Sequence, residues 1–234
     1  GGGYDDLTYM FTDFYAQGPW MRGSTNGFRC MKEIGNSNQS AYEEISLPFR
    51  DYYTEEPVTD ETFNFFLKQF DYDKTPLEAK ILDIDDSYPY AITEKIMFKA
   101  AYDNEEIIAY LFTPKNGKPP YKAIVYFPGS NAIHDNNSTV ISPKQFDYFL
   151  KSNYAVIHPI YKGTYERGTA LTSDYQNETV LYKDHVIWWG KDLKRSIDCL
   201  ESREDINSSQ LAYYGVSWGG GMGALMIPIE KRFK

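Results

Sequence analysis

One serine of the chain has the setting of an activated nucleophile. Ser217 is the centre of the sequence Gly215-Val-Ser-Trp-Gly219, which fits the pattern G-x-S-x-G. In a nucleophile elbow this pattern makes a sharp turn between a strand and a helix, and its glycines let the backbone segments approach each other. We expect Gly220, Gly221 and Gly223 to let the following helix pack closely. The motif predicts attack by the Ser217 hydroxyl on an acyl carbon, and the alternative is a glycine-rich turn without chemistry.

A second candidate element is the sequence Phe127-Pro-Gly-Ser-Asn131, which ends an earlier predicted strand. Acyl transfer requires N–H groups that bind the developing oxyanion. In folds with a nucleophile elbow, one N–H comes from the residue after the serine and the other from the loop after an earlier strand. We therefore predict oxyanion donors at Trp218 N–H and at Ser130 N–H, with Asn131 as the alternative to Ser130. A purely structural turn is the other interpretation of this loop.

The histidines do not supply an obvious base for Ser217. The order along the chain in this architecture is serine, acid, histidine, and no histidine follows Ser217. We predict that His158, in a strand, is a packed core residue and that His185, on a helix, is a surface or packing residue. His134 follows the predicted oxyanion loop, but the chain order argues against it as a general base. The acid and the histidine of a triad are expected beyond this chain.

The pattern of apolar residues predicts the elements that position these groups. Short apolar runs indicate strands at 80–87, 94–103, 105–115, 123–130, 154–163 and 210–215. Helical spacing indicates helices at 145–152 and 179–203 and directly after Ser217. Buried strands that alternate with helices favour a mostly parallel sheet covered on both faces. A hairpin around Asp103-Asn104 adds antiparallel strands at its N-terminal side.

A further short helix is predicted after residue 60. Phe63, Phe66, Leu67 and Phe70 follow Asp60 at the i, i+3, i+4 and i+7 positions of one helix face. Asp60 is a residue type that caps helix N-termini. We predict that the helix starts with Asp60 as its cap and that these apolar side chains are core or packing residues.

Composition excludes several classes of protein. The chain has 234 residues, 42% of them hydrophobic, and a net charge of −9. Such a chain is folded, and it lacks the basic surface that binding to nucleic acids or anionic membranes requires. Cys30 and Cys199 are too far apart to indicate a zinc site or a disulfide framework. We predict no metal, no cofactor, no membrane contact and a cytoplasmic location.

The region from about 62 to 234 resembles a known family. It is similar to the α/β-hydrolase module of large bacterial chains, some of which begin with a serine/threonine kinase domain. That module is related to prolyl oligopeptidases, dienelactone hydrolases and acetyl xylan esterases. The resemblance rests on the strings YDKTPLEAKILDIDDSYPY, FKAAYDNEEIIAYLFTPKNGKPPYKAIVYFPGSNAI, PIYKGTYERG, KDLKRSIDCLESREDI and LAYYGVSWGGGMG. It implies an α/β-hydrolase fold, a nucleophile at Ser217, oxyanion donors at Trp218 and Ser130, and a pocket rim formed by 161–167.

The N-terminal region has a different character. The sequence NGFRCMK at 26–32 resembles the C-terminal end of formylglycine-generating (sulfatase-modifying) enzymes. We therefore predict three parts: a tail of such a domain at 1–33, a linker at 34–60, and the N-terminal part of an α/β-hydrolase domain at 61–234. The chain is expected to be a segment of a longer polypeptide, with the sheet incomplete at its C-terminal side.

Two functions of different classes are consistent with these observations. The first is a serine hydrolase that acts on a small acyl or ester substrate through an acyl-enzyme at Ser217, in which case this chain alone is expected to be inactive. The second is a non-catalytic binding or regulatory module of a multidomain signalling protein, because a fold does not fix a function. An intact serine at the strained position of the motif favours the first.

Overall fold

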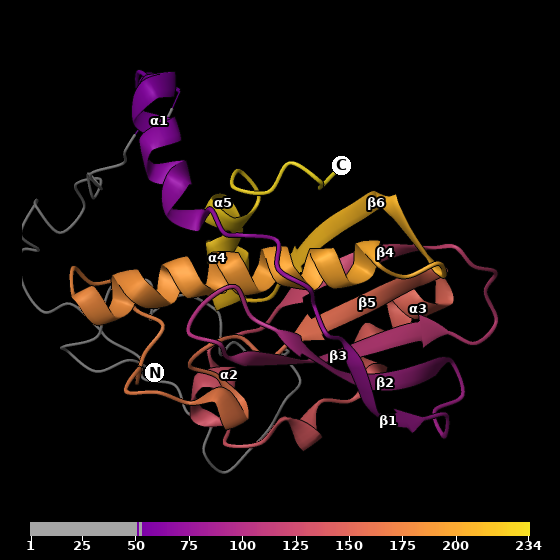
Figure 1. Cartoon of the computed structure of the whole chain (residues 1–234). Coiled ribbons are helices and arrows are strands. Elements are labelled where there is room, and N and C mark those ends of the chain that lie inside the picture. The colour runs from indigo at the N-terminus through magenta and orange to yellow at the C-terminus, as the bar shows by residue number, and fades with distance from the viewer. Residues whose placement is uncertain (1–50, 52) are drawn as a thin grey trace, which may run out of the picture. The chain divides into compact units, whose positions relative to one another are not determined.

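The computed structural model describes residues 51 and 53–234. Contacts divide the chain after Glu56, and the second unit is the one described below. The predicted tail at 1–33 and most of the predicted linker lie outside the described residues. The strands are β1 (Lys80–Asp85), β2 (Ala91–Lys99), β3 (Glu106–Pro114), β4 (Tyr121–Phe127), β5 (Tyr154–Pro159) and β6 (Ile206–Gly215) (Figure 1). The helices are α1 (Asp60–Leu67), α2 (Asn131–His134), α3 (Asp147–Lys151), α4 (Val180–Glu201) and α5 (Trp218–Met226).

The six strands form one mixed sheet in the order β1-β2-β3-β5-β4-β6. β1, β2, β3 and β5 pair antiparallel in succession, whereas β5 with β4 and β4 with β6 pair parallel. The predicted hairpin is present between β2 and β3, and Asp103 and Asn104 both have positive φ, at 50° and 53°. Such φ values at two successive residues are typical of tight hairpin turns. The predicted α/β-hydrolase fold, with antiparallel N-terminal strands, is confirmed. The described sheet is mixed rather than mostly parallel, since only the pairings of β5 with β4 and of β4 with β6 are parallel.

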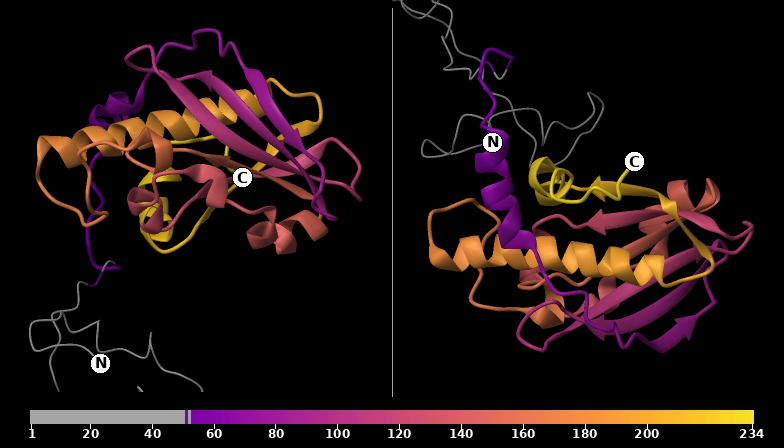
Figure 2. Two further views of the ribbon diagram at one scale, coloured as in Figure 1. Left: turned by 90° about the horizontal axis from the view of Figure 1, so that it is seen from below. Right: turned by 45° about the horizontal axis from the view of Figure 1, so that its top comes forward.

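Helices cover both faces of the sheet, because the central strands are apolar on both sides. Ala123, Val125 and Phe127 of β4 belong to the core cluster that includes α4 and α5. Ile124 and Tyr126 alternate with them and pack with α2 and α3 on the other face. Figure 2 shows α4 running across one side of the sheet and the short helices α2 and α3 on the opposite side. This alternation along a strand is the expected result of side chains that point to opposite faces.

The long helix α4 lies where a helix over 179–203 is predicted. Thr179 caps it through a side chain that accepts a hydrogen bond from the N–H of Tyr182. Trp189, Leu193 and Ile197 are fully buried on its inner side. The predicted helix at 145–152 begins as a 3-10 turn at Pro143–Phe146 and continues as α3. No helix among residues 51 and 53–234 is long and apolar enough to cross a membrane.

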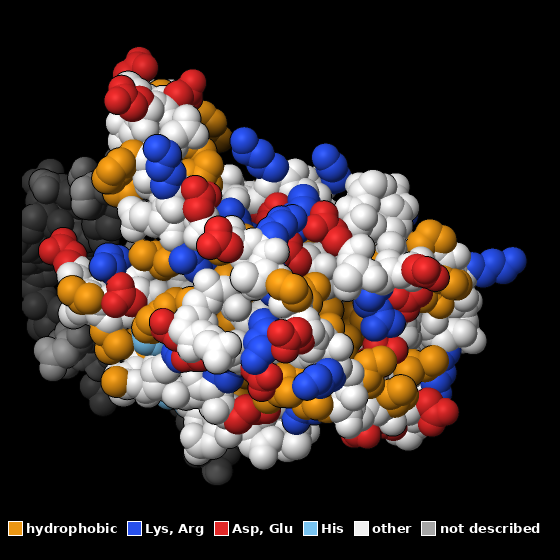
Figure 3. Space-filling model, viewed as in Figure 1, with side chains coloured by type: hydrophobic (Ala, Val, Ile, Leu, Met, Phe, Trp, Pro, Cys, Tyr) orange, Lys and Arg blue, Asp and Glu red, His pale blue; other side chains and the backbone are white. Residues whose placement is uncertain are grey.

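Helix α1 differs from the prediction in two respects. Thr59, not Asp60, is the N-cap, and its side chain accepts a hydrogen bond from the N–H of Thr62. Phe63 and Phe66 are 39% and 55% exposed, so the prediction that they are core residues is wrong. The helix projects beyond the sheet (Figure 1), and Figure 3 shows hydrophobic side chains on its surface. Phe70, after the helix end, is buried as predicted, and Leu67 is partly buried and packs against the same core cluster.

Candidate active site

Parallel pairing of two strands brings the two sequence motifs together. Phe127 at the end of β4 pairs with Gly215 at the end of β6. The segments that follow both strands therefore leave the sheet at the same edge. A Cβ atom placed on Gly129 would lie 3.6 Å from the Cβ atom of Ser217. The loop after β4 is thus in contact with the residue that precedes α5.

The backbone at Ser217 has the strained geometry of a nucleophile elbow. Its φ is 53° and its ψ is −112°, a combination that residues with a side chain rarely adopt. A Cβ atom on Gly215 would be 2.2 Å from the carbonyl oxygen of Gly219, and a Cβ atom on Gly219 would be 2.2 Å from that of Phe127. Both glycines of the motif are therefore required by close backbone contacts. The Ser217 side chain is exposed at the turn.

The other three glycines do not all contribute to packing as predicted. A Cβ atom on Gly221 would have no neighbour within 4 Å, and one on Gly220 would be in ordinary contact, at 3.5 Å, with the carbonyl oxygen of Gly215. Only Gly223 faces a close side chain, at 3.1 Å from Tyr213. The expectation for Gly221 is therefore wrong, because this residue lies on the outer side of α5.

Two backbone N–H groups at this edge of the sheet are available to a ligand. Trp218 is the first residue of α5, and Ser130 caps α2 with φ −62° and ψ −18°. Within the described part of the chain, neither N–H donates a hydrogen bond to another group, and the same is true of the N–H of Asn131, so Asn131 stays the alternative to Ser130. The Trp218 side chain is buried against Phe127 and Trp189, with ring centroids 4.9 Å and 4.8 Å away. This packing fixes the position of the residue whose N–H is free.

None of the three histidines forms a hydrogen bond with Ser217. His134 is exposed on α2. His185, for which we predict a surface or packing position, is a buried packing residue. Its ring nitrogens form hydrogen bonds with the Thr169 hydroxyl at 2.7 Å and with the carbonyl oxygen of Leu181 at 2.7 Å. His158 is 1% exposed, which confirms that it is a core residue.

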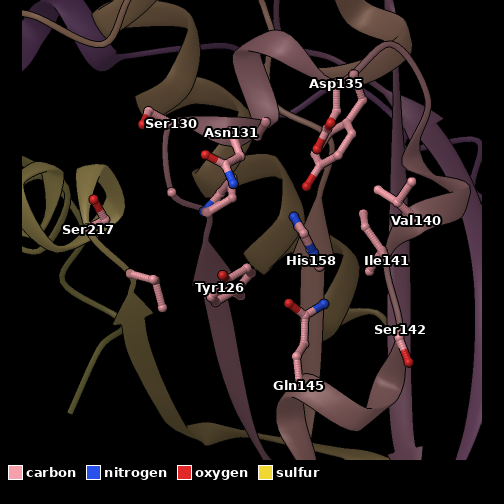
Figure 4. A pocket seen from close by; sticks show the side chains of 15 residues that line it. Tyr126, Ser130, Asn131, Asp135, Val140, Ile141, Ser142, Gln145, His158 and Ser217 are labelled. Carbon is pink, nitrogen blue, oxygen red and sulfur yellow. The ribbon is translucent and has the colours of Figure 1, made fainter. Parts of the chain in front are cut away.

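His158 also lines a pocket, which the sequence interpretation missed. The pocket has a volume of about 480 Å³ and reaches from Ser217 and the Gly129–Ser130 turn to His158. Figure 4 shows Ser217 at one side and His158 at the inner wall, between Asn131 and Gln145. His158 has the i, i+2 spacing that places it on the same strand face as Val156 and Ile160, which pack in the cluster with α2 and α3. This spacing predicts the face of the sheet but not the pocket.

The segment 161–167, predicted as a pocket rim, has two roles in the structure. Tyr165 lines the pocket. Arg167 instead turns inward and donates hydrogen bonds to Asp192 at 2.7 Å and to the Tyr102 hydroxyl at 2.6 Å. Asp192 is fully buried, and burial raises the pKa of its carboxyl although Arg167 opposes the shift. This ion pair joins the segment after β5 to α4, and no sequence motif indicated it.

The fold and the arrangement at this edge define an α/β-hydrolase-like protein. The structure is similar to that of an acetyl xylan esterase from Paenibacillus sp. R4, with a TM-score of 0.59 and 21% identity over 78% of this chain and 60% of that one. It is also similar to acetyl xylan esterase 1 from Thermoanaerobacterium sp. JW/SL YS485, with a TM-score of 0.55 and 16% identity over 75% of this chain and 55% of that one.

A third similar structure is a putative acetyl xylan esterase from Bacteroides fragilis, with a TM-score of 0.57 and 13% identity over 74% of this chain and 50% of that one. The chain thus spans 50% to 60% of the length of these three proteins. No protein-family model matches the sequence, and no curated protein matches it. The kinase-linked context and the formylglycine-type tail stay predictions.

Proposed function

We propose that this chain contributes the nucleophile and the oxyanion hole of a serine hydrolase that acts on carboxylic esters. The observation that carries the proposal is the strained backbone of Ser217, at φ 53°. Such strain is stored where a function requires it, and a serine held in this way presents its hydroxyl to a bound ligand. The similarity in fold to acetyl xylan esterases supports the same class of reaction.

In the proposed reaction Ser217 Oγ attacks the ester carbonyl carbon and passes its proton to a base. The carbonyl oxygen becomes an oxyanion that accepts hydrogen bonds from the N–H groups of Trp218 and Ser130. Collapse of this intermediate breaks the bond to the alcohol, which leaves with a proton. Water then attacks the acyl-enzyme, the carboxylic acid is released and Ser217 Oγ regains its proton.

The base and its acid partner are proposed to follow Lys234 in the full-length polypeptide. The chain order of the fold places them after the nucleophile. Each histidine of the described region precedes Ser217, and none contacts it. A serine without a base is a poor nucleophile, so we expect the isolated segment to be inactive.

The decisive experiment is labelling of the full-length polypeptide with a fluorophosphonate probe, followed by mass spectrometry of the labelled peptide. We expect one modification, on Ser217, and its loss in Ser217→Ala. Ser138→Ala is the matched control, because Ser138 is a fully buried serine that bonds Glu166. Absence of label on Ser217 in folded, full-length protein would overturn the hydrolase proposal. The non-catalytic binding module would then be the better description.

A further inference from the structure

His158 is buried in a way that leaves its polar atoms without partners. Neither Nδ1 nor Nε2 has a hydrogen-bond partner among the residues that the structure describes. The rings of Tyr126, Phe146 and Tyr165 surround the imidazole, at centroid distances of 4.7, 6.3 and 6.0 Å. A buried polar group without a partner destabilises a protein, and such groups in native structures call for an explanation.

The imidazole faces the pocket beside Ser217. In Figure 4 its ring rises from β5 into the space between the Asn131 and Gln145 side chains. The remaining polar lining consists mainly of hydroxyl and amide groups, including Ser130 and Ser142. A ligand that enters the pocket from Ser217 therefore meets His158 at the inner wall.

The charge of the lining selects among possible ligands. Among the described residues that line the pocket, Asp135 is the one ionisable acid or base other than His158 and the tyrosines, and none is a lysine or an arginine. An anionic group would thus enter a pocket without a cation to pair with it, which is unfavourable. Burial lowers the pKa of His158 to about 3, so the ring is neutral at physiological pH. A neutral imidazole offers one donor and one acceptor, and a hydroxyl group complements both.

We propose that His158 is a substrate-recognition residue, which forms a hydrogen bond with an uncharged hydroxyl of the ester that Ser217 attacks. The proposal rests on the proposed function and adds the class of substrate: esters with a neutral hydroxyl on the part that enters the pocket. Sites that hydrogen-bond a substrate hydroxyl discriminate strongly against analogues without it, because their own polar groups then stay unpaired.

The test compares matched esters in the full-length polypeptide. One pair, glycerol monoacetate and propyl acetate, differs in the alcohol, and the other, ethyl lactate and ethyl propanoate, differs in the acyl group. In one of the two pairs, we expect kcat/KM to be at least about tenfold higher for the ester with the hydroxyl than for the matched ester without it. His158→Phe should abolish this preference, and His158→Gln, which keeps a donor and an acceptor, should retain part of it. Ethyl hydrogen succinate, which is anionic, should be a poorer substrate than ethyl butanoate.

Two further readouts separate the possible outcomes. His158→Phe replaces an unpartnered polar ring by an apolar one among aromatic neighbours, so its melting temperature should equal or exceed that of the wild type. Fluorophosphonate labelling of Ser217 in the wild type reports on the nucleophile independently of the preference between esters. The inference about His158 would be overturned if kcat/KM were equal within both pairs, or if His158→Phe showed the same preference as the wild type. In either case, labelling of wild-type Ser217 would still support the proposed hydrolase. Loss of labelling in the wild type would instead overturn the proposed function.

Discussion

Gly219 lies against the carbonyl oxygen of Phe127, so closely that a Cβ atom on the glycine would be 2.2 Å from that oxygen. The N–H of Gly219 also donates a hydrogen bond to the carbonyl oxygen of Pro128 at 3.0 Å. The first turn of α5 is thereby held against the end of β4. These contacts bring the Ser217 turn and the Ser130 turn next to each other.

Gly219→Ala is expected to force these backbones apart. The added methyl group would overlap the end of β4, which predicts a loss of about 1–3 kcal/mol of unfolding free energy or more, together with loss of Ser217 labelling. Urea denaturation and fluorophosphonate labelling measure the two effects. Gly221→Ala is the matched control on the same helix. Because nothing lies within 4 Å of its added Cβ atom, it should be neutral or stabilising by up to about 1 kcal/mol. Equal effects of the two substitutions would contradict this account.

Ser130→Pro in the full-length polypeptide tests the second proposed oxyanion donor without changing the side chain of Ser217. The φ of Ser130 is −62°, which matches the value that a proline ring imposes. The substitution therefore removes the N–H while the local backbone can stay in place. We expect kcat to fall about 10²–10³-fold, as for removal of one oxyanion donor. Ser130→Ala, which keeps the N–H, should retain activity. If both variants retain activity, the donor is not Ser130.

Arg167 and Asp192 form a buried ion pair whose disruption should be costly. Asp192 is fully buried and the Arg167 side chain is 8% exposed. Arg167→Met leaves a buried carboxylate without its partner, which predicts a loss of about 3–5 kcal/mol of unfolding free energy. The double variant with Asp192→Leu should lose less than the sum of the single losses. Lys183→Ala is the control, because it removes an ion pair with Asp184 in which the two side chains are 60% and 38% exposed. It should change the unfolding free energy by less than about 0.5 kcal/mol. Additive losses in the double variant would argue against direct coupling.

Burial of His158 predicts a pH dependence of stability. Its pKa is about 3 in the folded protein and about 6.5 in an unfolded chain. Between these values the unfolded state binds more protons, so this residue makes the unfolding free energy rise with pH and fall on acidification. The limiting slope from one such group is about 1.4 kcal/mol per pH unit. Urea denaturation over this pH window should show a smaller slope in His158→Phe. His134→Gln, on the exposed surface of α2, is the control, and an unchanged slope in His158→Phe would contradict the burial of an uncharged ring.

Local patterns in the sequence were sufficient for the elements and for the candidate nucleophile. Strand alternation and helical spacing depend on near neighbours, so the strands, α4 and the hairpin at Asp103-Asn104 could be predicted. The G-x-S-x-G motif could be interpreted because Gly215 meets a steric requirement within the turn itself. The requirement at Gly219 is tertiary, since its neighbour is the carbonyl oxygen of Phe127 in β4. The Ser130 turn could be connected to Ser217 only through knowledge of how such folds arrange their loops.

The tertiary structure decided what depends on distant segments. Phe63 and Phe66 have the spacing of a core helix, yet they are exposed because α1 extends beyond the sheet, and spacing does not specify which surface a helix meets. Arg167 meets Asp192 because the segment after β5 folds back onto α4, 25 residues away along the chain. His158 faces both the core and the pocket, since a strand pattern assigns a residue to a face of the sheet but does not show what lies above that face.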